Sequence, residues 1–317
     1  MNQAPPTPKG FRDILPEAAK IRRQTINKIA DVLEEEGFVP IETPTVEFAE
    51  TLTGKYGEEE KLIYKFTDRG ERELALRYDL TVPLARFIAS NQSLTQNGPF
   101  RRYQIGQVFR GENPQHGRYR EFTQFDFDTV GFEKGSGDQD AKEDAKIIKT
   151  AIMAARDVGL KDAIMTINHR ASFSDMKVEV TRAFDKTHKI GLDGVKKELL
   201  DLGYSDNDFE GFKTKLEQGR KNVALTPVIG ALKDNKMEEG KDFRFDWTLA
   251  RGLDYYTGTI FELKPNGNLD SLSIGAGGRY DNLIGTFVYP ANGGAGKQIP
   301  AVGFSFGLDR LIEVINP

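Results

Sequence analysis

The chain has 317 residues, 38% of them hydrophobic, and a formal net charge of −4 at pH 7. This length predicts about two domains, and the weak negative charge means that any surface for nucleic acid must be a local basic one. The absence of cysteine excludes disulfides and cysteine-ligated metals. The sequence has neither an apolar run of the ~18 residues that cross a membrane nor a signal-peptide pattern, so we expect a soluble, cytoplasmic protein.

The first ninety residues predict short elements after an extended, proline-rich arm at Pro5–Pro8. Pro16 is placed as the first residue of a helix, apolar residues follow at helical spacing, and Gly37 is a natural stop. A proline-interrupted strand, a hairpin and a helix are predicted next, over residues 38–48, 61–78 and 80–90.

The middle of the chain predicts a long antiparallel hairpin, residues 101–110 and 118–131, around a polar loop. A helix (139–158) and a strand (162–169) follow, and from about 170 to 240 the chain becomes helical and charged. Strands resume at Phe243, and residues 301–315 form a final strand and short helix. Strands and helices outside a regular alternation predict an α+β fold, with an antiparallel sheet flanked by helices and an inserted helical subdomain.

The returning strand of the hairpin has two chemically different faces. Gln124, Asp126 and Asp128 point one way, while Phe125 and Phe127 point into the core. The polar face is either a solvated edge or, if it is central, the lining of a polar pocket, because unpaired carboxylates are seldom buried.

Two further segments carry groups that suit a charged ligand. Asp79 and Thr81, together with Gln124, could receive an ammonium group, which offers three donors; Asp79 is equally well placed to cap the helix that follows, and the two roles are compatible. The hairpin loop, together with the start of the strand before it, concentrates basic side chains, which suit phosphate or are ordinary surface charges. These are Arg101, Arg102, Arg110, His116, Arg118 and Arg120.

The stretch ARGLDYYTG places Arg251 close to the adjacent Tyr255 and Tyr256. On a strand these tyrosines would point to opposite faces, so both could not be core residues. The glycine-rich segment 275–281 fits no phosphate-loop pattern and indicates only close approach of the backbone.

One motif suggests a different enzyme class. Gly303-Phe304-Ser305-Phe306-Gly307 matches the G-x-S-x-G of hydrolases, which need an acid and a histidine downstream. Only 12 residues follow Ser305 and all three histidines precede it, so the hydrolase interpretation is disfavoured. Three scattered histidines without cysteine equally disfavour a transition-metal site.

Taken in order, these segments resemble the class II aminoacyl-tRNA synthetases, and within them the histidyl-tRNA synthetases. The N-terminal GFRDILPEAAKIR and FVPIETPTVE are similar to the family's start and its dimer-forming motif 1; FRGE with RYREF resembles motif 2, and AVGFSFGLDRL resembles motif 3. ARGLDYYTG and GGRYD are similar to the two histidine-specific signatures. The resemblance implies that residues 1–168 and 243–317 form the catalytic core around a helical insertion at 169–242.

The resemblance also implies residue roles. The ATP-binding residues would be Arg110 (on the α-phosphate), Glu112, Phe122 and Arg310. The histidine-binding residues would be Asp79, Thr81, Gln124, Asp128, Arg251, Tyr255 and Tyr256, with Arg110 and Arg251 catalytic. Gln115, Arg118 and Arg120 would contact tRNA(His). A homodimer is implied, with ATP as a substrate and Mg²⁺ on its phosphates; no metal-ligating residues are assigned.

Three interpretations of the chain's function stay open at this point: a synthetase core, a regulatory paralogue and a non-catalytic tRNA sensor. The family normally continues into an anticodon-binding domain after motif 3, so we expect either a catalytic fragment or a natural protein that lacks that domain. A histidine-sensing paralogue, the regulatory subunit of ATP phosphoribosyltransferase, also lacks that domain and has no ligase activity, and a non-catalytic tRNA sensor is a third interpretation. The presence of Arg110, Glu112, Arg251, Tyr255, Tyr256 and Arg310 favours the synthetase.

Overall fold

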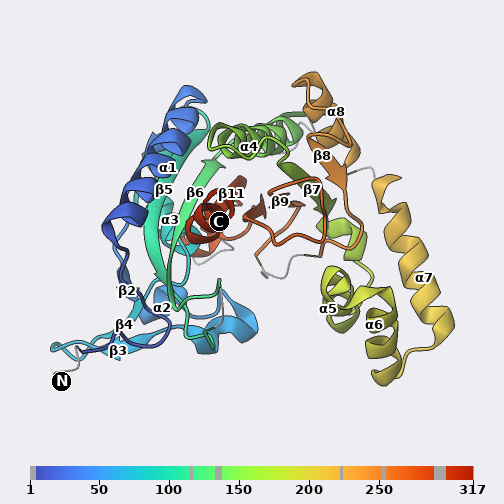
Figure 1. Cartoon of the computed structure of the whole chain (residues 1–317), viewed down its shortest axis with the longest axis horizontal. Helices are drawn as coiled ribbons and strands as arrows, with labels where there is room; N and C mark the ends of the chain where they lie inside the picture. The colour runs from blue at the N-terminus through green and yellow to red at the C-terminus, as the bar shows by residue number, and fades with distance from the viewer. Residues whose placement is uncertain are drawn as a thin grey trace.

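A computed structural model describes residues 5–114, 117–132, 138–221, 224–250, 255–288 and 298–316; within them the chain is organised around an eight-stranded sheet (Figure 1). The strand order is β1-β5-β6-β11-β10-β9-β7-β8. Their bounds are β1 Val39–Pro40, β5 Phe100–Phe109, β6 Glu121–Val130, β7 Ile164–His169, β8 Phe243–Phe245, β9 Thr259–Lys264, β10 Gly275–Arg279 and β11 Ala301–Gly307. The sheet is antiparallel from β5 to β7, whereas the edge strands β1 and β8 pair in parallel. The predicted α+β class and the long hairpin are confirmed.

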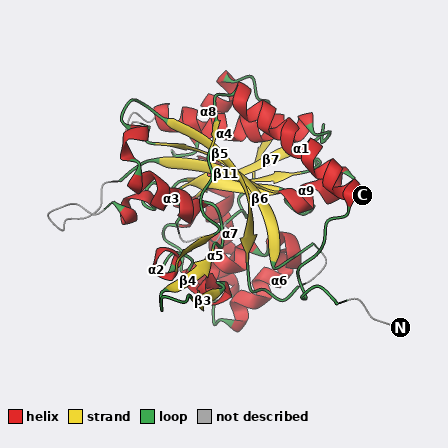
Figure 2. Cartoon of the chain, turned by 90° about the vertical axis from the view of Figure 1, so that its left-hand side faces the viewer, coloured by secondary structure: helices red, strands yellow, loops and turns green. Residues whose placement is uncertain are grey.

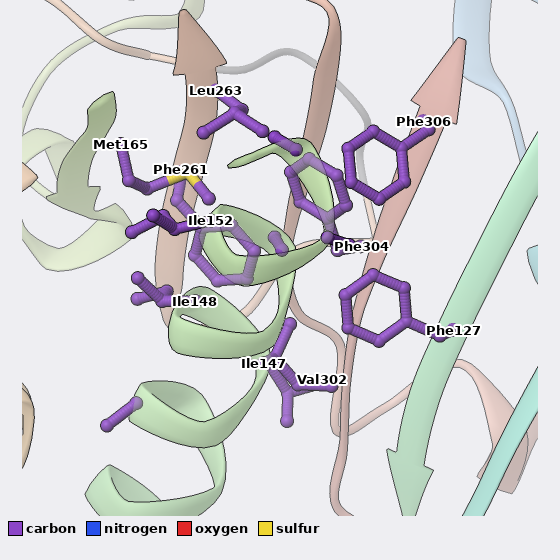
Figure 3. Packing of buried hydrophobic residues seen from close by; sticks show 14 of the residues in the cluster. Phe127, Ile147, Ile148, Ile152, Met165, Phe261, Leu263, Val302, Phe304 and Phe306 are labelled. Atoms are coloured by element: carbon purple, nitrogen blue, oxygen red, sulfur yellow. The ribbon is translucent and has the colours of Figure 1, made fainter. Parts of the chain in front are cut away.

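Four helices cover one face of this sheet and enclose the main core. They are α1 Pro16–Glu35, α4 Asp138–Asp157, α8 Thr226–Asp234 and α9 Leu308–Ile315. Figure 3 shows Phe127, Phe304 and Phe306 of the sheet packed beside Ile147 and Ile148 of α4. This is the phenylalanine side of β6, so the alternation in the sequence identified the core face correctly.

The opposite face carries smaller elements, and Figure 2 shows them across the large sheet from α1, α4 and α8. A three-stranded sheet has the order β2-β4-β3, and it packs with two helices over a second apolar cluster. The bounds are β2 Val46–Phe48, β3 Lys65–Thr67, β4 Glu73–Leu76, α2 Ala49–Leu52 and α3 Thr81–Ser90. β3 and β4 form the predicted hairpin, and α3 the predicted helix.

The charged segment after β7 is helical, and its first part has its own apolar cluster, which includes Phe184, Phe209 and Leu216. This first part comprises α5 Val178–Asp185, α6 Thr187–Asp201 and α7 Asp206–Glu217, which Figure 1 shows to one side of the sheet. By contrast, α8 packs on the main core beside α4. The division at residues 169 and 242 stays a proposal, and packing associates α8 with the main core.

The remaining described helical turns are 3-10 helices: η1 Gly57–Leu62, η2 Gln92–Thr95, η3 Arg170–Phe173, η4 Gln218–Lys221 and η5 Ile284–Phe287. Within the described ranges no helix combines the length and apolar character needed to cross a membrane.

Candidate active site

The floor of the site is a grid of side chains from three adjacent strands. Alternate residues of β5, β6 and β11 face away from the phenylalanine core, and the strand register aligns them in three rows. These rows are Arg102–Asp128–Gly303, Gln104–Asp126–Ser305 and Gly106–Gln124–Gly307. Asp126 and Asp128 are only 2% and 3% exposed. The polar face of β6 therefore lines a pocket, and the solvated-edge interpretation is wrong.

Above this floor lies a cavity of about 590 Å³, a size typical of small-ligand sites. Most of the residues predicted from the sequence line it. They are Asp79, Thr81, Arg110, Glu112, Arg118, Phe122, Gln124, Asp128, Tyr255, Tyr256 and Arg310. The fold thus brings the long hairpin, the start of α3, the tyrosine pair and the β11–α9 junction to one place.

Three of the predicted residues are not placed in this lining. Arg120 instead ties the hairpin loop to the N-terminal arm: its Nε donates to the carbonyl of Glu112 at 2.9 Å and its Nη1 to that of Lys9 at 3.5 Å. Arg251 and Gln115 lie outside the described residues.

Asp128 is held by two partners that we did not assign from the sequence. Tyr280 donates its hydroxyl to Oδ1, and Arg102 Nη2 lies 2.7 Å from Oδ2. Arg102 is fully buried. The pKa of Asp128 is raised, because burial raises it by more than the nearby guanidinium of Arg102 lowers it. The alternation of the hairpin carried this signal, because Arg102 and Asp128 occupy facing positions in its two strands.

Two more buried carboxylates face the cavity. Asp79 Oδ1 accepts from the Val82 N–H and from the Tyr56 hydroxyl, each at 3.0 Å, so Asp79 both supports the start of α3 and lines the cavity. Burial raises its pKa. Burial, with Asp128 as a nearby negative charge, raises the pKa of Asp126 to about 7. Such a cluster favours a ligand that carries a positive charge.

Tyr255 and Tyr256 both line the cavity, with ring centroids 4.9 Å apart. The opposite-face geometry considered for them does not apply, because these residues lie in a turn and the segment after it and not on a strand. Gly278 leaves room for Tyr256: a Cβ there would lie 2.8 Å from Tyr256 Cδ1. The close backbone approach predicted for the glycine-rich segment is confirmed at this position.

At the hairpin end of the cavity, Arg110 lies between two aromatic rings. Its guanidinium carbon is 4.3 Å from the centroid of Tyr78 and 5.0 Å from that of Phe122, and its Nε donates to the Tyr78 carbonyl at 3.2 Å. Arg310 Nη1 donates to the carbonyl of Ser273 at 2.9 Å. Ser305 lies within β11 and accepts from Gln124 Nε2 at 2.9 Å; it is not on the strand-to-helix turn of a hydrolase nucleophile.

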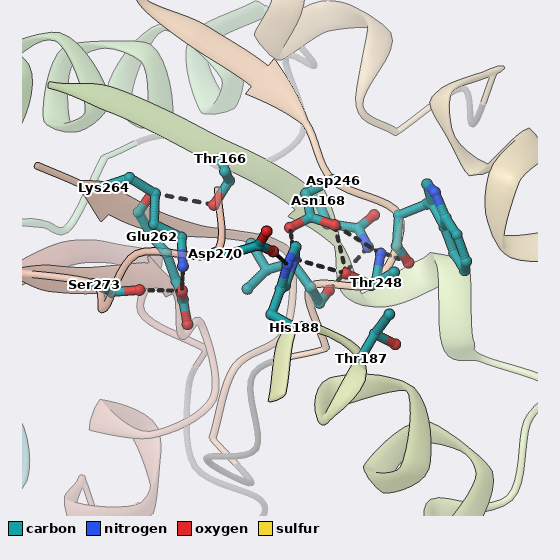
Figure 4. Close-up of polar contacts among 12 residues, drawn as sticks. Thr166, Asn168, Thr187, His188, Asp246, Thr248, Glu262, Lys264, Asp270 and Ser273 are labelled. Atoms are coloured by element: carbon teal, nitrogen blue, oxygen red, sulfur yellow. Dashed lines mark hydrogen bonds and ion pairs between the residues drawn. The ribbon is translucent and has the colours of Figure 1, made fainter. Parts of the chain in front are cut away.

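A further wall of the cavity joins the helical segment to the sheet (Figure 4). His188, from the start of α6, places Nε2 2.8 Å from Asp246 Oδ2 and Nδ1 3.1 Å from Asp270 Oδ1. These carboxylates raise the pKa of His188 to about 9. In the same view Glu262 pairs with Lys264 at 3.4 Å and accepts from the Ser273 hydroxyl.

The chain is similar to known proteins over nearly its whole length. The family profile described as histidyl-tRNA synthetase matches residues 10–189 and 196–311. The histidine–tRNA ligase of Aeropyrum pernix is 40% identical over 98% of this chain and 74% of its own length. That of Helicobacter pylori strain P12 is 37% identical over 98% of this chain and 75% of its own.

Solved structures are also similar. The histidyl-tRNA synthetase from Nostoc sp. PCC 7120 superposes with a TM-score of 0.79 at 32% identity, covering 98% of this chain and 75% of that one. A Bacillus halodurans protein described as an ATP phosphoribosyltransferase regulatory subunit/histidyl-tRNA synthetase has a TM-score of 0.78 at 25% identity, covering 98% and 83%.

Proposed function

Because the chain belongs to the histidyl-tRNA synthetase family, we propose that it is a histidine–tRNA ligase. It activates L-histidine with ATP to histidyl-adenylate and pyrophosphate, and then transfers the histidyl group to the terminal ribose of tRNA(His). The observation that carries this proposal is the polar cavity that gathers Asp128, Tyr256, Arg110 and Arg310, in a chain that matches the family over nearly its whole length.

The acidic end of the cavity suits histidine. A neutral imidazole presents one donor and one acceptor, so Asp128 accepts from its N–H while the Tyr256 phenol donates to its bare nitrogen, and Tyr255 supports the pocket. Arg102, with Nη2 2.7 Å from Asp128 Oδ2, contributes by favouring the ionised, accepting form of this carboxylate against the effect of burial. The α-ammonium group is received by Asp79, Thr81 and Gln124.

The basic end of the cavity suits ATP. Arg110 binds the α-phosphate, Glu112 the adenine amino group, Phe122 the adenine ring, and Arg310 the γ-phosphate. No three acidic or histidine side chains form a metal-binding group in the described parts of the chain. Mg²⁺ commonly binds through one or two carboxylates plus substrate phosphates, and Glu112 and Glu262 line this cavity; when bound, it would offset phosphate charge.

Activation is an in-line displacement at the α-phosphorus. A carboxylate oxygen of histidine forms the new O–P bond, the bond to the bridging oxygen of the β-phosphate breaks, and pyrophosphate leaves. No side-chain nucleophile is required. We assign Arg110 and Arg251 to this step, because positive charges beside the phosphorus stabilise the negative charge that develops there in the transition state.

The remaining proposals concern tRNA binding, the cellular location and the oligomeric state. Arg118, Arg120 and Gln115 contact tRNA(His) from the hairpin loop, the chain acts in the cytoplasm, and it forms a homodimer. Exposed apolar side chains support the dimer, because Val39, Phe48 and Phe66 are 48%, 51% and 41% exposed and lie on or near the segment that resembles motif 1.

Histidine-dependent exchange of pyrophosphate into ATP tests the ligase. We expect exchange with wild type, and Arg251→Ala should slow adenylate formation by ~10²–10³ at saturating substrates, since it removes one stabilising group. The similarity to the Bacillus halodurans protein keeps a second candidate, a histidine-sensing regulatory subunit. Histidine binding without any exchange would favour that candidate over the ligase.

A further inference from the structure

Four buried side-chain oxygens of residues that line the cavity accept no hydrogen bond from the described residues. One of them, Asp128 Oδ2, has an ion-pair partner in Arg102 Nη2, 2.7 Å away, which leaves three without a partner of either kind among the described residues. They are Asp79 Oδ2, Gln124 Oε1 and Asp126 Oδ1, and each is buried. Buried acceptors of this kind are uncommon in folded proteins and usually have a reason. All three residues line the same cavity, so a ligand bound there can supply the missing donors.

The number of these acceptors matches one chemical group. An ammonium group carries three N–H donors and no acceptor, and the positive charge suits a site with two carboxylates. Thr81 also lines the cavity, but its hydroxyl is a weaker partner for a cation than a carboxylate is. Asp126 therefore competes well with Thr81 for the third donor.

The surroundings of Asp126 hold its carboxylate in place. It is the centre of the middle row, between Gln104 of β5 and Ser305 of β11. Ser305 faces Asp126 in the register of β11 and β6, and its hydroxyl accepts from Gln124 Nε2 at 2.9 Å. The same serine thus orients the Gln124 amide beside Asp126, which gives the serine of the G-x-S-x-G segment a function unrelated to hydrolysis.

We propose that Asp126 is a specificity-determining residue: its Oδ1 accepts a hydrogen bond from the α-ammonium group of the bound amino acid, together with Asp79 Oδ2 and Gln124 Oε1. This inference rests on the proposed function, because it takes histidine as the ligand. It assigns the middle row of the floor to the amino group and leaves Asp128 to the imidazole.

Two ligands separate these assignments: L-histidine, and 3-(imidazol-4-yl)propionate, which lacks the amino group. Their dissociation constants are measured by calorimetry for wild type, Asp126→Asn and Asp128→Asn. A hydrogen bond to a charged group contributes ~1.5–3 kcal/mol, or about 10–100-fold in affinity. We expect Asp126→Asn to lose about that factor for histidine and under about threefold for the analogue, whereas Asp128→Asn weakens both ligands.

Equal effects of Asp126→Asn on both ligands, or no effect on either, would overturn the inference. If wild type still binds histidine, the proposed function stands in that case. Failure of wild type to bind histidine would overturn both. Asp126→Ala serves as a second variant, and thermal unfolding of each variant establishes that it is folded before affinities are compared.

Discussion

At the residue scale, the space beside Asp128 depends on a glycine. Gly303 faces Asp128 in the register of β11 and β6, and a Cβ at Gly303 would lie 1.8 Å from Asp128 Oδ1. The first glycine of the G-x-S-x-G segment therefore serves close packing: it lets a carboxylate lie flat over the sheet, where any larger residue would displace it.

Gly303→Ala should accordingly reduce histidine affinity by at least about tenfold, since Asp128 must move and loses its hydrogen bond from Tyr280 and its ion pair with Arg102. Gly307→Ala in the same strand is the matched control, because the nearest atom to its Cβ would be 3.8 Å away. Calorimetric titration with histidine measures both. An unchanged affinity in Gly303→Ala would show that Asp128 does not read the ligand.

Arg102 is the second residue on which the floor depends. It is fully buried, and its guanidinium lowers the pKa of both Asp126 and Asp128 against the effect of burial. Removing one partner of a buried ion pair leaves an uncompensated charge, which lowers the free energy of unfolding by about 3–5 kcal/mol.

We expect Arg102→Met to lose stability of about that size at pH 8, and less at pH 5. Without the guanidinium, the folded-state pKa of each carboxyl rises further above its unfolded value. The fold then tolerates these carboxyls in their protonated form at low pH, whereas their ionisation at higher pH destabilises it. Urea unfolding at both pH values measures the difference. A deficit that does not depend on pH would point to lost packing instead of electrostatics.

At the element scale, α6 is joined to the sheet through one titratable side chain. His188 contacts Asp246 after β8 and Asp270 in the β9–β10 loop; Thr248 Oγ1 lies 3.1 Å from its Nε2, and Lys264 opposes its charge. The folded-state pKa of about 9 lies above the ordinary 6.5. The stabilisation is therefore fully present below about pH 6.5 and is lost as pH rises through 9.

The attachment of α5–α7 should consequently weaken between pH 7 and pH 9.5. Trp247, the only tryptophan in the sequence, packs against Phe184 of α5 with ring centroids 6.1 Å apart, so its fluorescence reports unfolding of this part. We expect its urea midpoint to fall over that range in wild type. In His188→Gln the midpoint should be lower at pH 7 and nearly constant with pH; a parallel fall in both proteins would exclude His188 as the cause.

At the scale of the whole molecule, the small sheet presents an apolar surface. Phe48 of β2 and Phe66 of β3 flank Leu74 in one row across β4, and Val46 is 38% exposed beside them. Neighbouring exposed apolar residues of this kind mark interaction surfaces, and here a second copy of the chain is the proposed partner.

Phe48→Asp should shift the protein from dimer to monomer in light scattering coupled to gel filtration, because a carboxylate would be buried at the interface without a partner. Leu272→Asp is the control: Leu272 is 73% exposed in the β9–β10 loop and is not part of the small sheet. A wild-type monomer, or equal behaviour of the two variants, would contradict the proposed interface.

Much of this protein follows from local pattern. The 3.6-residue spacing after Pro16 predicts α1, and the alternation in residues 122–128 separates the phenylalanine core from the polar floor. Side-chain direction along a helix or strand depends on near neighbours only, so a single sequence is enough. The order of motifs around ARGLDYYTG was likewise sufficient to identify the family that the comparisons show.

Tertiary structure alone decided which of these groups meet. Asp128 could be predicted to face a pocket, but its contacts with Arg102, Tyr280 and Gly303 come from positions 26, 152 and 175 residues away in sequence (128−102, 280−128 and 303−128). The packing of α8 on the main core and the shared cavity of Tyr255 and Tyr256 were not evident either. Such contacts depend on strand register and on the packing of distant segments, and a one-residue change of register would reverse every face.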